Sequence, residues 1–335
     1  MKILITTGIY PPEIGGPAQY SKNLKLALEA MGNKVFVRTF SVENYFPTGL
    51  RHIFFFLKII PKVISSDAVF VFDQFSTGLP TIFACKIFGR KSVIRTGGDF
   101  LWEEYVERTG KMILFRNFYK EEMDGLSTKE RVIFNLTKWT LTNASKVVFS
   151  TVWQRDIFIS AYSLDIGKTE IIENYYGPKE EDAGAESKVF VASSRNLKWK
   201  NLESLRKIFD SIMAEDKEVV LFTDNLPYID FMDKIRGCYA VAQVSIGDIS
   251  PNMILDSIRC GKPFICTRDV GILPRIKDVG IFVDPLNTEE IKQAVLYLLI
   301  KENYEKEREK IRAFSFVHSW QDIASEFLRV NQFIK

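Results

Sequence analysis

Two basic side chains follow a strand-like run in the second half of the chain. The apolar stretch "KVFVA" leads directly into "SSRNLKWKN", which places Arg195 and Lys200 five residues apart at a strand exit and the following helix start. A guanidinium can hold two phosphate oxygens at once and an ammonium adds a point charge, so this pair can bind a diphosphate without metal. A solvated basic loop explains the pattern equally well, because Lys198 and Lys200 flank Trp199.

Two carboxylates lie further along, in "GDISPNMILDSIRCGKP". Asp248 stands in a loop and Asp256 follows eight residues later, inside an amphipathic helix. Pro251 is a favoured first helical residue and Ser250 a favoured N-cap, so we expect the helix to begin there with free N–H groups. We expect Asp256 to border a buried pocket, and pairing with Arg259 is its plain structural alternative.

The third candidate is the first turn of the chain, "YPPEIGGPAQY", which follows the apolar run "KILITTGI". Gly15 and Gly16 permit positive φ and close approach of backbone N–H groups to an anion before the next helix. A turn without a ligand is the alternative. The segment is not a dinucleotide fingerprint, because no GxGxxG follows, and this weakens an oxidoreductase interpretation.

The elements that position these residues alternate between short strands and helices. In the first half the expected strands are "KILITTG", "KVFVRTF", "AVFVFDQ", "KSVIRTG" and "KVVFST", with helices at 20–31, 49–64 and 78–89. In the second half they are "KVFVAS", "EVVLFTD", "YAVAQVS", "PFICTRD" and "IFVDP", with helices at 200–214, 227–237, 251–260 and 288–302. This alternation predicts an α/β protein with two doubly wound parallel sheets. The helical residues 100–140 have no clear place in it.

Length and composition agree with two domains. The chain has 335 residues, 46% of them hydrophobic, and a net charge of +3 from 45 basic and 42 acidic side chains. That balance does not indicate a nucleic-acid-binding protein, which would carry an excess of basic residues. The four cysteines form no CxxC pair, which argues against zinc ribbons and disulfide frameworks, and only two histidines are present. The short apolar N-terminus lacks a signal-peptide pattern, so we expect a cytoplasmic protein.

Four segments in the same order resemble glycosyltransferase family 4, the retaining GT-B enzymes that use nucleotide sugars. They are "YPPEIGGPAQY", "SRNLKWKN", "GDISPNMILDSIRCGKPFI" and "GIFVDPLNTEEIKQAV". The resemblance implies two Rossmann-like domains facing a cleft: an acceptor-side domain at 1–174, a linker at 175–188, and a nucleotide-sugar domain at 189–317. A C-terminal helix at 318–335, beginning near Trp320, would pack back on the first domain.

The resemblance also assigns roles to residues. Gly15 and Gly16 would face the donor diphosphate, which Arg195 and Lys200 would hold and stabilise as a leaving group. Asp248 would approach the transferred sugar and Asp256 would bind the ribose hydroxyls. The sugar and phosphate pocket would be lined by the backbone of Ile249, Ser250, Pro251 and Asn252. Asp99, in "GGDFLWEE", would orient the sugar or the acceptor.

Three departures from the family pattern accompany these assignments. Both acids are Asp where the family has Glu, no His stands in the "GGD" loop, and the stretch between "VVLFTD" and "YAVAQVS" is short. The implied activity is metal-independent, cofactor-free, front-face transfer of a sugar to a glycan or lipid-linked hydroxyl, as in polysaccharide biosynthesis. A non-catalytic sugar-nucleotide-binding or scaffold protein of the same fold is the alternative.

One segment bears on location. In "LRHIFFFLKIIPKVI" the cations Arg51, Lys58 and Lys62 stand beside several Phe and Ile side chains. Such a face can dock on the inner side of an anionic membrane that holds a lipid-linked acceptor. A helix of the hydrophobic core is the alternative.

Overall fold

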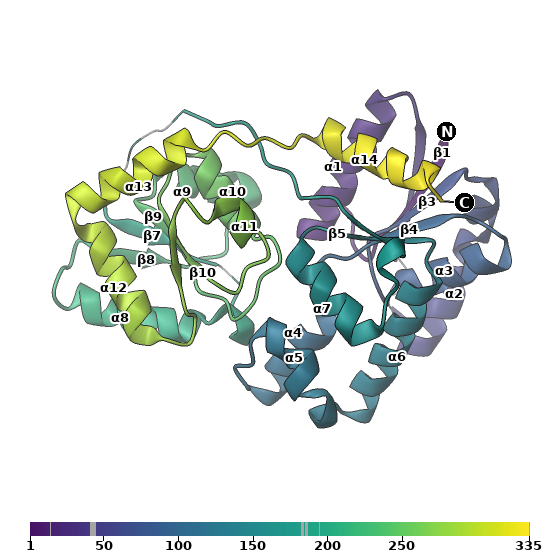
Figure 1. The fold of residues 1–335 in the computed structure, drawn as a ribbon, viewed down its shortest axis with the longest axis horizontal. Coiled ribbons are helices and arrows are strands. Elements are labelled where there is room, and N and C mark those ends of the chain that lie inside the picture. Colours follow the sequence, from purple (N-terminus) through teal and green to yellow (C-terminus); the bar gives the residue numbers. More distant parts are fainter. Residues whose placement is uncertain (14, 41–44, 182–183, 185–186, 194, 335) are drawn as a thin grey trace. The chain divides into compact units, whose positions relative to one another are not determined.

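A computed structural model describes residues 1–13, 15–40, 45–181, 184, 187–193 and 195–334 (Figure 1). The chain divides into two compact units, which we treat separately. Unit 1 comprises Met1–Leu101, Gly125–Tyr175 and His318–Lys335, and unit 2 comprises Trp102–Asp124 and Tyr176–Val317.

Unit 1 is built on a six-stranded parallel sheet with the strand order β2-β1-β3-β4-β5-β6. Its strands are β1 Lys2–Thr6, β2 Lys34–Arg38, β3 Ala68–Val71, β4 Ser92–Arg95, β5 Lys146–Phe149 and β6 Thr169–Ile171. In β1, Ile3 pairs with Val35 of β2 on one side and with Ala68 of β3 on the other. The central strands are buried on both faces, which explains why they are continuous apolar runs.

Helices cover both faces of this sheet. They are α1 Gly16–Ala30, α2 Thr48–Ser65, α3 Gly78–Ile87, α6 Thr128–Asn143, α7 Val152–Tyr162 and α14 Trp320–Gln332. In Figure 1, α1 and α14 lie above the sheet, whereas α2, α3 and α6 lie together below it. The C-terminal helix α14 packs on α1, where the ring of Trp320 meets that of Tyr20 at 5.1 Å between centroids.

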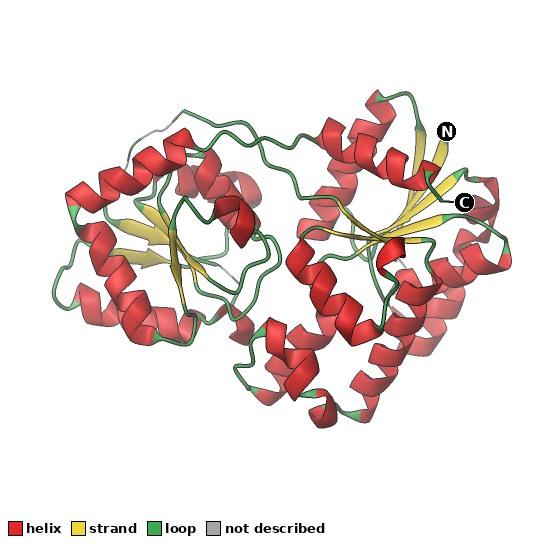
Figure 2. Cartoon of the chain, viewed as in Figure 1, coloured by secondary structure: helices red, strands yellow, loops and turns green. Residues whose placement is uncertain are grey.

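Unit 2 has a five-stranded parallel sheet with the order β11-β10-β9-β7-β8, flanked by helices (Figure 2). Its strands are β7 Val189–Val191, β8 Val220–Phe222, β9 Ala240–Gln243, β10 Phe264–Thr267 and β11 Ile281–Val283. Its helices are α8 Leu202–Met213, α9 Tyr228–Gly237, α10 Asn252–Arg259, α11 Leu273–Ile276, α12 Thr288–Leu299 and α13 Lys301–Ala313. The predicted α/β class with two doubly wound parallel sheets is therefore confirmed.

The largest difference from the sequence analysis concerns α4 Phe100–Thr109 and α5 Phe115–Glu121. The sequence analysis includes this region in a first domain at 1–174, but contacts group Trp102–Asp124 with unit 2. The physical reason is aromatic packing, because the Trp102 ring meets Trp199 of unit 2 at 5.6 Å between centroids. We call Trp102–Asp124 the insertion. Of the expected linker 175–188, residues 182, 183, 185 and 186 lie outside the described residues.

Two further observations concern the chain as a whole. All four cysteines are buried and unpaired, and burial raises the pKa of the Cys85 and Cys238 thiols to about 12. Among the described residues, no helix is both long enough and apolar enough to cross a bilayer.

Candidate functional site

A mostly buried ion pair lies at the carboxyl edge of the sheet in unit 2. The Lys200 ammonium is 2.8 Å from the Asp248 carboxylate, and their side chains are only 13% and 14% exposed. The Gln243 amide donates to the same carboxylate oxygen at 2.6 Å. Lys200 follows β7, and Gln243 is the last residue of β9. Because parallel strands bring their carboxyl ends to one edge, residues far apart in the sequence meet where α/β proteins bind ligands.

Backbone hydrogen bonds hold the Asp248 loop in place. The Asp248 N–H donates to the Asp269 carbonyl at 2.9 Å, and the Asp248 carbonyl accepts from the Gly271 N–H at 2.9 Å. Two residues earlier, the Ile246 N–H donates to the Trp199 carbonyl at 2.9 Å. The loop is thus joined to the segments that follow β7 and β10, and Asp248 is presented at a fixed position.

Arg195 lies in the same loop after β7 but has a different environment. Its side chain is exposed, and within the described part of the chain nothing hydrogen-bonds its guanidinium. The preceding Ser194 lies outside the described residues. The two predicted phosphate-binding cations therefore differ: Lys200 already binds a carboxylate, whereas no described residue occupies the guanidinium donors of Arg195.

The structure corrects the predicted start of the helix that carries Asp256. Helix α10 begins at Asn252, Pro251 is its N-cap, and Ser250 lies outside the helix. Pro251 has φ −71° and ψ 111°, an extended backbone that suits proline in the cap position. Ile249 and Pro251 are buried in this loop.

Two hydroxyl groups near this loop lack partners. The Oγ atoms of Ser245 and Ser250 are buried, and neither has a hydrogen-bond partner within the described part of the chain. Buried hydroxyls in proteins nearly always have such partners. Both groups are therefore candidates to contact a ligand.

Asp256 is the buried member of a second charged network in unit 2. Its carboxylate accepts from the Arg259 guanidinium at 3.1 Å, so the structural alternative from the sequence analysis is correct as far as pairing goes. Arg259 also pairs with Glu180 at 2.5 Å, and Glu180 pairs with Arg236 at 2.7 Å. Burial raises the pKa of Asp256 to about 6, while Arg259 acts in the opposite direction.

From the raised pKa of Asp256 we expect a pH-dependent cost to the free energy of unfolding. The unfolded carboxyl has a pKa near 3.8 and the folded one about 6, so ionisation costs the folded state free energy above pH 6. That cost disappears as the pH falls towards 4. Asp256→Asn should therefore raise the free energy of unfolding by about 1–2 kcal/mol at pH 7.5, but only about a third as much at pH 4.5, in urea titrations. The exposed Asp230→Asn serves as control, and an equal gain at both pH values would contradict the argument.

The remaining predicted residues belong to unit 1. Gly16 opens α1 and Gly15 precedes it with an extended backbone, φ 161°, so the expected positive φ is not observed. Instead, the lack of room for a side chain favours glycine at position 15, because a Cβ there would lie 2.7 Å from Ile9 Cδ1. Among the described residues, no side chain caps the exposed start of α1, so its amides can reach an anion. Asp99, in the loop between β4 and α4, is 3% exposed.

The sequence analysis missed the residues by which the insertion reaches the Asp248 loop. The Phe115 N–H donates to the Ile246 carbonyl at 3.2 Å. Arg116 forms an ion pair at 3.1 Å with Asp269, without the alignment of a hydrogen bond. Asp269 is buried, which raises its carboxyl pKa, while Arg116 opposes that shift. Gln243 was also missed, although a lone amide at the end of an apolar strand is a signal that a sequence analysis could use. The residues of the insertion that make these contacts have no such signal in the sequence.

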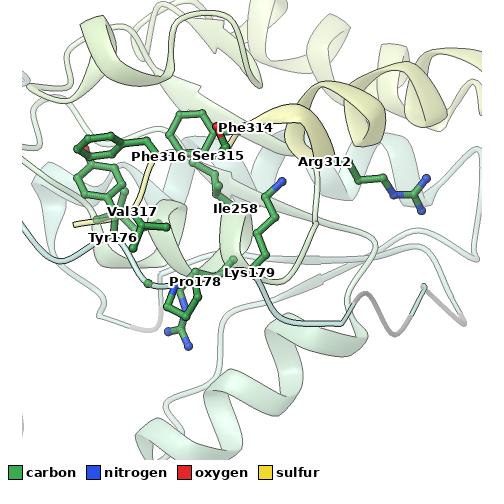
Figure 3. A pocket seen from close by; sticks show the side chains of 12 residues that line it. Tyr176, Pro178, Lys179, Ile258, Arg312, Phe314, Ser315, Phe316 and Val317 are labelled. Carbon is green, nitrogen blue, oxygen red and sulfur yellow. The ribbon is translucent and has the colours of Figure 1, made fainter. Parts of the chain in front are cut away.

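Unit 2 also contains a hollow of about 300 Å³ beside α10 (Figure 3). It is lined by residues 176–179, by the 312–317 segment, and by Leu255, Ile258 and Arg259 of α10. Arg195, Lys200 and Asp248 do not line it. Arg259 connects the hollow to the Asp256 network, whereas the Lys200–Asp248 pair is not part of its lining.

The described residues contain no group of three or more His, Cys, Asp or Glu side chains that could hold a metal ion.

No protein-family model and no curated protein sequence matches the chain. Solved structures do match, at low sequence identity. Sucrose-phosphate synthase from Thermosynechococcus elongatus is 14% identical with a TM-score of 0.69, covering 99% of this chain and 98% of that one. HepE from Anabaena in complex with UDP and glucose is 16% identical with a TM-score of 0.66, covering 99% and 97%. A glycosyltransferase from Rickettsia africae is 12% identical with a TM-score of 0.64, covering 99% and 98%.

These similarities extend over nearly the full length of each chain, so they apply to the two-unit architecture and not to one sheet alone. The chain has the α/β fold of the GT-B glycosyltransferases.

Proposed function

We propose that this protein is a retaining glycosyltransferase of the family 4 type, which transfers a sugar from a nucleotide-diphosphate sugar to an acceptor hydroxyl. The observation that carries the proposal is the Lys200–Asp248 pair at the carboxyl edge of the sheet in unit 2, close in sequence to Arg195. The similar HepE structures hold UDP, glucose and UDP-glucose, which supports a nucleotide sugar as the ligand.

The proposed roles follow from the donors and acceptors that each residue offers. Arg195 and Lys200 bind the donor diphosphate, and Lys200 can do so while paired, because an ammonium has three donors. Asp248 accepts from a sugar hydroxyl and Asp256 from the ribose. The loop from Ile249 to Asn252 binds sugar and phosphate through its backbone and through the hydroxyl of Ser250.

Unit 1 contributes separately in this proposal. The amides at Gly15 and Gly16 bind diphosphate oxygens, and Asp99 orients the sugar or the acceptor. The acceptor is a glycan or a lipid-linked glycan.

The chemistry is front-face substitution and needs no carboxylate nucleophile. The bond between the anomeric carbon and the diphosphate oxygen breaks, and an oxocarbenium-like sugar forms. The acceptor oxygen then bonds to the anomeric carbon on the same face, and its proton passes to the departing phosphate oxygen. Arg195, Lys200 and the free amides of the helix starts stabilise the negative charge that develops on the diphosphate. These cations replace a metal ion in this role.

A panel of nucleotide sugars and nucleoside diphosphates tests the proposal. We expect one nucleotide to raise the melting temperature, since a ligand that binds only the folded state stabilises it. Asp256→Ala should weaken binding of that nucleotide about tenfold in calorimetry, because a hydrogen bond to a charged group is lost. Asp230→Ala, an exposed acid on α9, is the control. No shift with any nucleotide, or equal binding by both variants, would overturn the proposed site.

One observation favours a second candidate function, that of a non-catalytic sugar-nucleotide-binding or scaffold protein. Asp248 already neutralises the Lys200 ammonium, which reduces the charge available to a leaving diphosphate. Such a protein would bind the preferred nucleotide sugar but would neither hydrolyse nor transfer it. Product formation with the donor selected by the panel distinguishes the two functions.

A further inference from the structure

Helix α2 of unit 1 has an apolar stripe on its outer side. Leu50, Ile53, Phe54, Leu57 and Ile64 are between 43% and 57% exposed. Their spacing of three, four or seven residues places them on one side of an α-helix. The opposite side, with Phe55, Ile59 and Val63, is fully buried in unit 1. The interpretation as a core helix is therefore correct for one side of α2 and leaves the other side unexplained.

The neighbouring helix extends this stripe. On α3, Phe83 and Ile87 are 47% and 54% exposed, and the Phe83 ring lies 5.5 Å from that of Phe56 on α2. On the far side, Phe83 lies 6.0 Å from the Trp139 ring of α6. Figure 1 shows α2, α3 and α6 side by side. We define the apolar face as the outward side chains of α2 and α3: Leu50, Ile53, Phe54, Leu57, Ile64, Phe83 and Ile87.

The charges next to the apolar face have one sign. The segments that form α2 and α3 carry Arg51, Lys58, Lys62 and Lys86 and contain no Asp or Glu. The Lys62 ammonium lies 3.9 Å from the centroid of the Phe36 ring. The Lys58 ammonium donates to the Thr39 carbonyl at 3.0 Å. The Phe36 ring carries no charge, so it leaves the positive charge of Lys62 in place.

A basic hollow of about 450 Å³ lies at the C-terminal end of α3. Lys86, Arg90, Lys91 and Lys168 line it, and no acidic side chain is among the described lining residues. The Arg90 guanidinium donates to the Ile64 carbonyl at 2.5 Å, which connects the hollow to the end of α2. Lys168 donates to the Thr142 carbonyl at 3.4 Å. An anionic group of the size of a lipid phosphate complements such a hollow.

We propose that unit 1 docks on an anionic membrane through the apolar face, with the basic hollow receiving a lipid phosphate. An exposed apolar patch on a monomer marks an interaction site. A stripe flanked by the cations of α2 and α3 complements the acyl boundary and the negative surface of anionic lipids. Trp139 on α6 is of the type that concentrates at membrane interfaces. This inference does not depend on sugar transfer, but it would bring the enzyme to a lipid-linked acceptor.

Vesicle flotation of the full chain tests the inference. We expect binding to phosphatidylcholine vesicles that contain about 30% phosphatidylglycerol, and binding that is at least fivefold weaker to pure phosphatidylcholine or in 0.5 M salt. Leu57→Glu should reduce binding to the anionic vesicles about tenfold, because it places a carboxylate in the stripe. Lys86→Glu should reduce it about fivefold.

Matched variants on α1 separate docking from a general effect of charge. Leu26 is 53% exposed and Lys22 is also exposed, so Leu26→Glu and Lys22→Glu make the same changes outside the apolar face. Equal losses in Leu57→Glu and Leu26→Glu, or equal binding to neutral and anionic vesicles, would overturn the proposal. So would a dimer in sedimentation velocity that Leu57→Glu dissociates, since a second copy would then cover the face. Vesicle binding without transferase activity would leave docking intact and count against the proposed function alone.

Discussion

Arg195→Ala should lower kcat about 30-fold to 1000-fold, equivalent to about 2–4 kcal/mol of transition-state stabilisation. The guanidinium is proposed to bind the diphosphate most strongly when the sugar leaves and negative charge develops there. Steady-state kinetics with the donor identified by the nucleotide panel measure the effect. An unchanged kcat would contradict the proposed mechanism.

The surroundings of Arg195 allow an effect on catalysis to be distinguished from an effect on stability. Its guanidinium is exposed and has no hydrogen-bond partner in the described part of the chain, so its removal breaks no internal contact found there. The melting temperature should therefore stay within about 1 °C of the original, as for surface substitutions in general. Lys207→Ala on α8 removes a cation that is 72% exposed and serves as the control for charge.

Gly247→Ala should lower the free energy of unfolding by about 2–3 kcal/mol. A Cβ at this position would lie 2.5 Å from Phe115 Cβ and 3.1 Å from the Trp102 ring. Phe115 Cβ is attached directly to the backbone of α5, so the insertion itself would have to move. Because Gly247 precedes Asp248, activity should fall as well. Urea unfolding followed by intrinsic tryptophan fluorescence measures the loss.

Gly237→Ala provides a matched comparison within unit 2. Gly237 is exposed at the end of α9, and a Cβ there would meet nothing within 4 Å. This variant should be neutral or slightly more stable, because alanine restricts the unfolded chain. If the two alanine variants unfold at the same urea concentration, the insertion does not pack against the Asp248 loop as described.

Local patterns were sufficient for most of the fold. Apolar runs such as "AVFVFDQ" and "PFICTRD" identify buried parallel strands, since both faces of those strands are covered. β6, Thr169–Ile171, was missed because only Ile171 of its three residues is apolar, so it lacks the apolar run of the other strands. The expected helix at 288–302 is interrupted at Ile300, whose extended backbone separates α12 from α13. Nothing in the apolar spacing of that segment marks the break.

The candidate site was predictable in part. Lys200 and Asp248 were both identified from their segments, but their direct pairing joins residues 48 positions apart. Such pairing depends on strand order, and a single sequence does not reveal which strands are neighbours. The same limit applies to Trp102, Phe115 and Arg116, whose partners follow β7, β9 and β10. Ser250 was placed correctly in the loop, while its role as N-cap depended on a helix start predicted one residue too early.

The insertion affects how the chain can be divided into fragments that correspond to the two units. The backbone passes between the units four times, after Leu101, Asp124, Tyr175 and Val317. Unit 2 is consequently not encoded by one uninterrupted stretch of sequence. A fragment limited to residues 176–317 would expose the Trp199 ring and Gly247 to water, so a soluble half-molecule requires residues 102–124 to be joined to it or added as a separate peptide.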